Sequence, residues 1–255
     1  MVCYGHNPEL NKVRLKMNSD LNIFLLIGQS NMAGRGDVQD VSPLKHSHIL
    51  KFSESGWQIA EEPLHADNPN IAGVGLAMSF AIEILRIQPA AKIGLVPCAV
   101  GGSALSRWMP GTELYENAVL TTKQAIFNGS FKGILWHQGE NDSCNSGDAY
   151  DYGKRLKKMI RSLRSDLHAE TVPFITGELG NFLRELKEFK YFDLVNQHLR
   201  RLEKSVQYYG CAEADGLTDN GDQLHFDAKS LRTFGIRYAK KYFTLGSRKF
   251  SNGKR

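Results

Sequence analysis

Short runs of apolar, β-branched residues alternate along this chain with longer segments in which apolar residues recur every three or four positions. The short runs predict strands, and the longer segments predict helices with one apolar face. The expected strands are 21–27, 92–97, 131–136, 172–176 and 206–212, and the expected helices are 74–87, 115–127, 150–163, 189–202 and 228–243. Such alternation is typical of parallel strands joined by right-handed crossovers. We therefore predict a three-layer α/β/α sandwich with a five-stranded parallel sheet.

The segment 34–70 interrupts this alternation, because it is rich in Ser, Pro, Asp, Asn and His and holds only a weak strand pair near 49–52 and 57–60. We interpret it as an insertion lying over the site, within a single domain that spans residues 1–255. Residues 244–255 are predicted to form a basic tail. A length of 255 residues, with 42% hydrophobic and 23% charged residues, suits one globular domain of this kind.

Several classes of partner are disfavoured by composition. The longest apolar runs are too short to span a bilayer, and residues 1–20 lack the apolar core of a signal peptide, so we expect a cytoplasmic chain with no membrane partner. A chain trimmed of its signal would look similar. The net charge of +5 lies partly in the tail, without a nucleic-acid motif, which favours a solvated C-terminus over nucleic-acid binding. The sequence leaves the oligomeric state open.

The four cysteines, Cys3, Cys98, Cys144 and Cys211, are widely separated and have no zinc-ligand spacing. We interpret them as reduced thiols, with Cys98 and Cys211 as buried packing residues. The expectation is a protein without metal or cofactor.

Ser30 follows the first predicted strand, in the stretch Gly-Gln-Ser-Asn-Met-Ala-Gly over 28–34. At a strand end beside a helix start, backbone N–H groups can stabilise an oxyanion, which suits a nucleophile. A serine is also a common helix N-cap, so this position alone leaves both interpretations open.

The next two strand ends carry candidate oxyanion donors. The second strand leads into Gly101-Gly102, where a glycine pair permits close approach and presents N–H groups, although a plain tight turn explains it equally well. The third strand leads into Gln138 and Asn141, whose amides can donate to an oxyanion without competing for a proton. Helix capping is the alternative for Asn141.

Asp222 and His225 lie three residues apart between the fifth strand and the last helix. At this spacing a carboxylate can accept from Nδ1 of the imidazole and leave Nε2 free to take a proton from a serine. A surface loop or a metal site is the alternative for an isolated pair. Because all four features follow different strands, they are expected at one edge of the sheet, where together they are the parts of an acyl-transfer site.

These blocks resemble those of the SGNH or GDSL-like hydrolases, in the branch of sialate O-acetylesterases and carbohydrate esterase family 6 acetylxylan esterases. The matching blocks are 28–36, 101–103 with Trp108, 136–142, and Asp222-x-x-His225. The resemblance implies a flavodoxin-like fold, Ser30 as nucleophile, and Ser30, Gly102 and Asn141 as oxyanion donors. Gln138 is the competing third donor.

By the same resemblance we expect a serine esterase that removes acetyl groups from the hydroxyls of small acetylated sugars or oligosaccharides. Substrate contacts are expected at five further positions, namely Arg35, His65, Arg107, Glu140 and Glu178. The alternatives are a thioesterase or lipase with the same chemistry, and a non-catalytic carbohydrate-binding module of the same fold.

Overall fold

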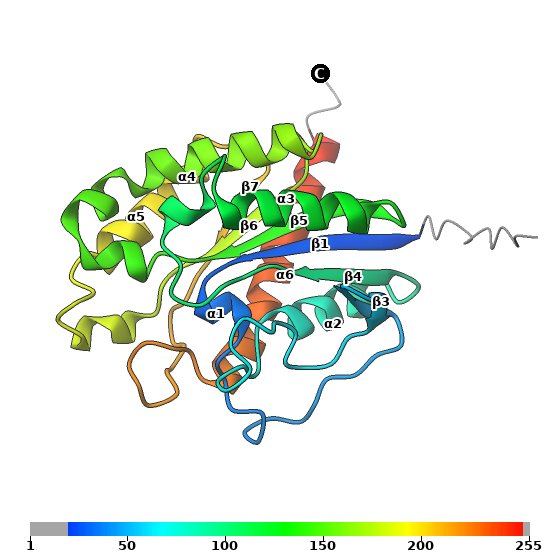
Figure 1. The fold of residues 1–255 in the computed structure, drawn as a ribbon, viewed down its shortest axis with the longest axis horizontal. Coiled ribbons are helices and arrows are strands. Elements are labelled where there is room, and N and C mark those ends of the chain that lie inside the picture. Colours follow the sequence, from blue (N-terminus) through cyan, green and yellow to red (C-terminus); the bar gives the residue numbers. More distant parts are fainter. Residues whose placement is uncertain (1–19, 252–255) are drawn as a thin grey trace, which may run out of the picture.

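The computed structural model describes residues 20–251 of the chain, with side chains through residue 245. The core of this part of the chain is a seven-stranded sheet with the order β3-β2-β4-β1-β5-β6-β7 (Figure 1). All neighbouring strands are parallel except the β2–β3 pair at one edge. The strands are β1 Leu21–Gly28, β2 Ile49–Ser53, β3 Gly56–Ile59, β4 Lys92–Pro97, β5 Ser130–His137, β6 Phe174–Gly177 and β7 Tyr209–Ala212.

The five predicted strands, β4, β1, β5, β6 and β7, form one continuous part of the sheet that ends at the β7 edge, and β2 and β3 widen the sheet on the other side. Both extra strands come from the segment 34–70, which therefore belongs partly to the sheet and is more than a covering insertion. Ile49 is fully buried and pairs with Ile93 of β4, while the rings of Phe52 and Trp57 pack at 5.0 Å. The two strands are short and mostly half-buried, so their hydrophobic pattern is weak.

The helices cover both faces of the sheet, which confirms the predicted three layers. Helices α3, α4 and α5 pack against one face, and α2 and α6 pack together on the other (Figure 1). The helices are α1 Ser30–Ala33, α2 Ala77–Ile87, α3 Glu113–Ile126, α4 Ser146–Asp166, α5 Phe192–Leu202 and α6 Ala228–Ser251, with 3₁₀ turns at Leu105–Trp108, Asn141–Cys144 and Asn181–Glu185.

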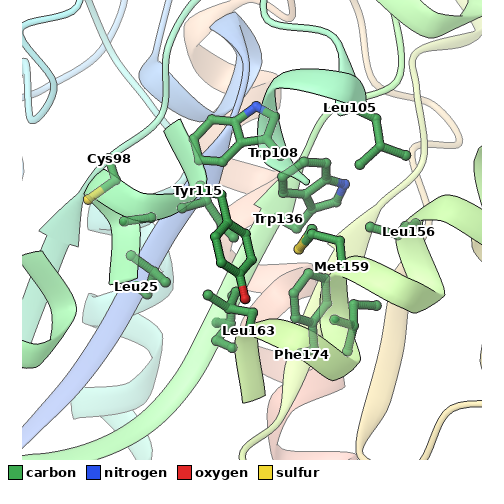
Figure 2. Packing of buried hydrophobic residues seen from close by; sticks show 14 of the residues in the cluster. Leu25, Cys98, Leu105, Trp108, Tyr115, Trp136, Leu156, Met159, Leu163 and Phe174 are labelled. Carbon is green, nitrogen blue, oxygen red and sulfur yellow. The ribbon is translucent and has the colours of Figure 1, made fainter. Parts of the chain in front are cut away.

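Strand β1 is buried on both faces, as expected for the centre of a parallel sheet. Leu25 and Ile27 point into the layer of α3 to α5, whereas Phe24 and Leu26 point towards α2 and α6. Figure 2 shows part of the first layer, where the indole rings of Trp108 and Trp136 meet edge to face at 5.7 Å between centroids. This packing supports the loops that follow β4 and β5.

The end of the chain differs from the prediction. Helix α6 continues to Ser251, so most of the segment predicted as a basic tail is the last part of a helix; residues 252–255 lie outside the described residues. The predictions for residues 1–19, including Cys3, also fall outside them. Within 20–251, no helix combines the length and apolarity needed to cross a bilayer.

The strand order places a crevice at the carboxyl end of β1. When the five predicted strands are numbered along the chain, their order across the sheet is 2-1-3-4-5. The chain thus moves from β1 to β4 on one side of β1, and then from β4 to β5 on the other side. In open α/β sheets, ligands bind where the strand order reverses direction, in the crevice outside the carboxyl ends of the strands. The segments that follow β1, β4 and β5 all lie at this edge.

Candidate active site

Ser30 is the first residue of α1, directly after the end of β1. The strand can turn there because Gly28 adopts φ +130° and approaches β5 so closely that a Cβ would lie 2.0 Å from the carbonyl oxygen of His137. As the first residue of a helical turn, Ser30 has no carbonyl in its own turn to accept from its N–H. The local backbone therefore presents both the hydroxyl and the N–H of Ser30 at the strand end.

The structure brings Ser30, His225 and Asp222 together. His225 Nε2 lies 2.9 Å from Ser30 Oγ, and His225 Nδ1 lies 2.6 Å from Asp222 Oδ2. Because a carboxylate only accepts, Nδ1 carries the proton and Nε2 accepts from the serine hydroxyl. The side chains come from segments almost 200 residues apart, and their order is that of a nucleophile, a base and an orienting acid.

The loop before α6 fixes the Asp222 carboxylate. Its Oδ1 accepts from the backbone N–H groups of Leu224 at 2.8 Å and His225 at 2.7 Å, in a turn where Gln223 adopts φ +59°. Partial burial alone would raise the pKa of Asp222, but these bonds and the imidazole outweigh it and hold the pKa below its usual range. The carboxylate stays ionised beside the imidazole.

Two backbone N–H groups and one side-chain amide belong to residues that line the cleft together with the Ser30 hydroxyl. Among the residues that the structure describes, the N–H groups of Ser30 and Gly102 donate to no other protein group. Gly102 adopts φ +66°, a conformation that favours glycine. Asn141 lines the cleft and donates through Nδ2 to the carbonyl oxygen of Gly102 at 3.0 Å.

Gln138, the competing amide, points into the protein. It is fully buried, and its amide nitrogen donates to Ser103 O at 3.2 Å and to Asp142 Oδ2 at 2.6 Å. Its oxygen accepts from Tyr152 at 3.1 Å. Both amide hydrogens are therefore used within the core, and the geometry favours Asn141 over Gln138 as a donor facing the cleft.

The cleft around Ser30 has a volume of about 450 Å³. Five of its lining residues were predicted as site residues, and they are Ser30, Arg35, Gly102, Asn141 and His225. The others are Gln29, Asp67, Asn68, Ile71, Val100, Gly101, Cys144, Phe189 and Leu224. Asp67 and Asn68 belong to the segment 34–70, so part of that segment forms the cleft wall.

Four expected substrate contacts do not line the cleft. Arg107 is exposed outside it, and His65 is buried behind the Arg35–Asp67 ion pair, where burial lowers its pKa to about 4. Glu178 is engaged by Arg200 at 2.7 Å and by a backbone N–H. For these residues the sequence indicated a strand end or a motif position, but exposure of Arg107, burial of His65 and the pairing of Glu178 with Arg200 keep them out of the cleft lining.

Glu140, the fourth, lies in a buried polar network behind Ser30. Its Oε1 accepts from Asn31 Nδ2 at 2.6 Å and lies 3.4 Å from His137 Nε2. Burial alone would raise the pKa of Glu140, but the contacts with His137 and Asn31 outweigh it and keep the pKa below its usual range. Glu140 therefore contacts Asn31, the residue after Ser30, rather than the cleft.

Asn31 is a site residue that sequence reasoning missed. Besides Glu140, its side chain contacts Leu224 O at 3.3 Å and the N–H of Phe226 at 3.1 Å, so it holds the backbone on both sides of His225. The only signal in the sequence is its position next to Ser30. Its partners lie more than 100 residues away.

The described cysteines are free, with Cys98 and Cys211 buried and Cys144 exposed. Burial raises the pKa of Cys98 and of Cys211 to about 12, which fits their predicted packing role. Within residues 20–251, no three or more His, Cys, Asp or Glu side chains are grouped as a metal would need.

Comparisons with known proteins place almost all of the described chain in one family. A family model described as carbohydrate esterase, sialic acid-specific acetylesterase, matches residues 20–244. A probable carbohydrate esterase of Arabidopsis thaliana is 34% identical over 245 residues, which cover 87% of this chain and 90% of the relative. A probable 9-O-acetyl-N-acetylneuraminic acid deacetylase of Escherichia coli is 29% identical over 151 residues, covering 50% of this chain and 45% of that protein.

Solved structures agree with this assignment. A structure of an Arabidopsis thaliana protein has a TM-score of 0.78 at 33% identity and covers 89% of this chain and 98% of its own. The structure of NanS shares the fold, with a TM-score of 0.74 at 18% identity and coverage of 91% and 99%. The chain therefore belongs to the carbohydrate esterase family of sialic acid-specific acetylesterases and is a carboxylic ester hydrolase.

Proposed function

We propose that this protein removes acetyl groups from carbohydrate hydroxyls, with Ser30 as nucleophile, His225 as general base and Asp222 as the acid that orients it. The observation that carries the proposal is the 2.9 Å contact between Ser30 Oγ and His225 Nε2, aligned with the 2.6 Å contact between His225 Nδ1 and Asp222. These distances lie within hydrogen-bond reach, so proton transfer needs no rearrangement of the chain.

In the first half-reaction, Ser30 Oγ attacks the ester carbonyl carbon while His225 Nε2 takes its proton. The tetrahedral intermediate collapses when the imidazolium returns this proton to the sugar oxygen, which leaves as a hydroxyl. The acetyl group remains on Ser30. In the second half-reaction, water attacks the acetyl-serine with His225 again as base, and acetate leaves while Ser30 regains its proton.

The oxyanion of each tetrahedral intermediate accepts from the N–H groups of Ser30 and Gly102 and from Asn141 Nδ2. The two N–H groups are free in the described structure, and an amide has two hydrogens, of which Asn141 uses one for Gly102 O. Donors of this kind, placed before the charge develops, typically contribute a factor of about 10² to 10³ each in kcat.

The cleft has the size and lining that a sugar ester needs. Its volume of about 450 Å³ lies in the range typical of small-molecule sites. Ile71 and Phe189 offer apolar surface, while Gln29 and Asn68 offer amides for hydroxyl groups. The family to which the chain belongs supports a carbohydrate acetyl ester as the substrate.

Hydrolysis of p-nitrophenyl acetate and of acetylated xylooligosaccharides tests the proposal. We expect Ser30→Ala and His225→Ala to lower kcat by at least about 10³-fold, because members of a triad act as a unit. Ser106→Ala, an exposed serine outside the cleft lining, is the matched control and should retain wild-type rates. A fluorophosphonate should label Ser30, as read by peptide mass. Near-normal turnover by Ser30→Ala would exclude the proposed mechanism.

Acyl length separates this activity from that of a thioesterase or lipase. We expect acetyl esters to react faster than octanoyl esters of the same alcohol. The opposite order would move the proposal to a long-chain esterase with the same catalytic residues.

A further inference from the structure

Asp67 joins two segments of the cleft wall through one carboxylate oxygen. Its Oδ2 accepts from the backbone N–H of Gly101 at 2.8 Å and from Arg35 Nη2 at 2.6 Å. Arg35 also donates through Nη1 to the carbonyl oxygen of Gly34 at 2.8 Å. Asp67 therefore connects the end of α1, which begins at Ser30, with the turn that follows β4.

Hydrogen bonds fix the turn after β4 on both sides of the Gly102 N–H group, which itself donates to no protein group among the described residues. The N–H of Val100 completes the ladder with β1 at 3.0 Å, and the carbonyl oxygen of Gly102 accepts from Asn141 at 3.0 Å. Asp67 holds the N–H of Gly101 between these two points. Among the described residues, the N–H of Gly102 has no protein partner and borders the cleft beside Ser30.

The ion pair and the turn each account for one of the two glycines that follow β4. A Cβ on Gly101 would lie 2.7 Å from Arg35 Nη2 and 3.0 Å from Asp67 Oδ2, so the pair packs directly against this residue. A Cβ on Gly102 would meet nothing within 4 Å, but its φ of +66° favours glycine. The first glycine thus admits the ion pair, and the second permits the turn.

We propose that Asp67 is a positioning residue of the oxyanion hole, which holds Gly101 so that the N–H of Gly102 faces the carbonyl oxygen of the bound ester. Arg35 directs the Asp67 carboxylate. The inference rests on the proposed function, because it assigns Gly102 to the oxyanion hole. The side chains of Arg35 and Asp67 are each only 4% exposed, so their contact is protected from water and salt.

Variants can separate the hydrogen bond to Gly101 from the charge of the pair. Asp67→Asn keeps an oxygen that can accept from Gly101, whereas Arg35→Leu with Asp67→Leu removes the acceptor and both charges together. The double variant avoids a buried, unpaired Arg35, which would be strongly destabilising. Glu61→Ala, which removes the exposed Lys45–Glu61 pair in the same segment, is the matched control.

We expect the double variant to lose about 10- to 100-fold in kcat on p-nitrophenyl acetate, with KM changed by less than about threefold, because the lost interaction acts in the transition state. Asp67→Asn should retain most of the wild-type kcat, and Glu61→Ala all of it. Phenylboronic acid gives a second readout, since its tetrahedral serine adduct places an oxygen in the oxyanion hole. Its Ki should rise by the factor by which kcat falls.

Circular dichroism and thermal unfolding establish that each variant is folded before its kinetics are compared. Should the double variant not fold, Arg35→Gln with Asp67→Ser replaces it, because this pair also removes both charges and serine is too short to reach Gly101. A folded variant that lacks the acceptor and keeps wild-type kcat and boronate affinity would overturn the inference. In that case an inactive Ser30→Ala still upholds the proposed function. An active Ser30→Ala would instead overturn both the proposed function and the role of Asp67.

Discussion

The side-chain oxygen of Asn31 accepts a hydrogen bond from the backbone N–H of Phe226 at 3.1 Å. This bond ties the residue after the proposed nucleophile to the residue after the proposed base. On the other side of His225, the Asn31 amide nitrogen lies 3.3 Å from Leu224 O. One side chain therefore sets the position of the imidazole relative to the serine.

We expect Asn31→Ala to lower kcat on p-nitrophenyl acetate by about 10- to 100-fold, because small misplacements of reacting groups are costly. The variant also leaves the buried Glu140 carboxylate without its 2.6 Å donor, which should reduce the free energy of unfolding by about 1 to 3 kcal/mol. Steady-state kinetics and urea unfolding measure the two effects. Asn117→Ala, at an exposed position of α3, is the control; equal kcat for both variants would contradict this role of Asn31.

A second prediction concerns the stability of the protein in acid. Burial lowers the pKa of His65 to about 4; Asp67 opposes this shift and Arg35 adds to it. A histidine in an unfolded chain titrates near 6.5, so between about pH 6.5 and 4 the unfolded chain binds a proton that the folded chain does not. The contribution of neutral His65 is complete above this window and is lost as the pH falls through it.

Urea unfolding at about pH 7.5 and about pH 4.5 should therefore show that the wild type loses about 2 to 3 kcal/mol more than His65→Gln does between these two values. Each protein is compared with itself, as the difference between its free energies of unfolding at the two pH values. A pH-independent change in stability caused by the substitution therefore cancels. Parallel losses in the two proteins would show that His65 does not stay neutral in the folded state.

A third prediction concerns the charge of the substrate. Among the described residues lining the cleft, Arg35 is the one permanent cation, and it is already paired with Asp67 at 2.6 Å. A substrate carboxylate would find no free cation there and would lie close to the Asp67 carboxylate. We therefore expect uncharged acetylated sugars to be favoured over acetylated sugar acids, including 9-O-acetyl-N-acetylneuraminic acid.

An acetylated methyl galactoside and its galacturonide counterpart differ in one carboxylate and make a matched pair. The kcat/KM should be about tenfold higher for the uncharged sugar, which corresponds to about 1.4 kcal/mol. Asp67→Asn should narrow this ratio, because it leaves the charge of Arg35 uncompensated. A wild-type preference for the sugar acid would contradict the prediction and point to a cation outside the cleft lining.

The sequence predicts this fold well where local patterns carry the information. Strands such as 21–27 and 92–97 and the apolar face of 74–87 depend on periodicity, and the Asp222–His225 pair depends on spacing within one turn. Strands β2 and β3 were only weakly indicated, because they are short and half-buried at the sheet edge.

The parts of the site that escaped prediction depend on contacts distant in sequence. Asp67 meets Gly101 across 34 residues, and Asn31 meets Phe226 across 195. Gln138 and Asn141 follow the same strand with the same functional group, and only the packing turns Gln138 inwards. Residue type and order thus indicate the chemistry, while the direction of each side chain requires the folded chain.

A last prediction uses the thiol in the cleft. Cys144 is exposed and lines the cleft, whereas Cys98 and Cys211 are buried and have pKa values raised to about 12. Partial burial, with Glu188 and Asp142 nearby, also raises the pKa of Cys144, so its reaction should be slow but should precede that of the two buried thiols.

We expect N-ethylmaleimide at mildly alkaline pH to modify Cys144 before Cys98 and Cys211 and to abolish most of the activity, because the adduct occupies space beside Asn141 and Phe189. Peptide mass mapping against time identifies the modified thiol, and hydrolysis of p-nitrophenyl acetate follows the loss of activity. Cys144→Ser retains Cys3 and the buried thiols, and it should remain active throughout the treatment. Equal inactivation of wild type and Cys144→Ser would show that another cysteine is responsible and that Cys144 does not border the working cleft.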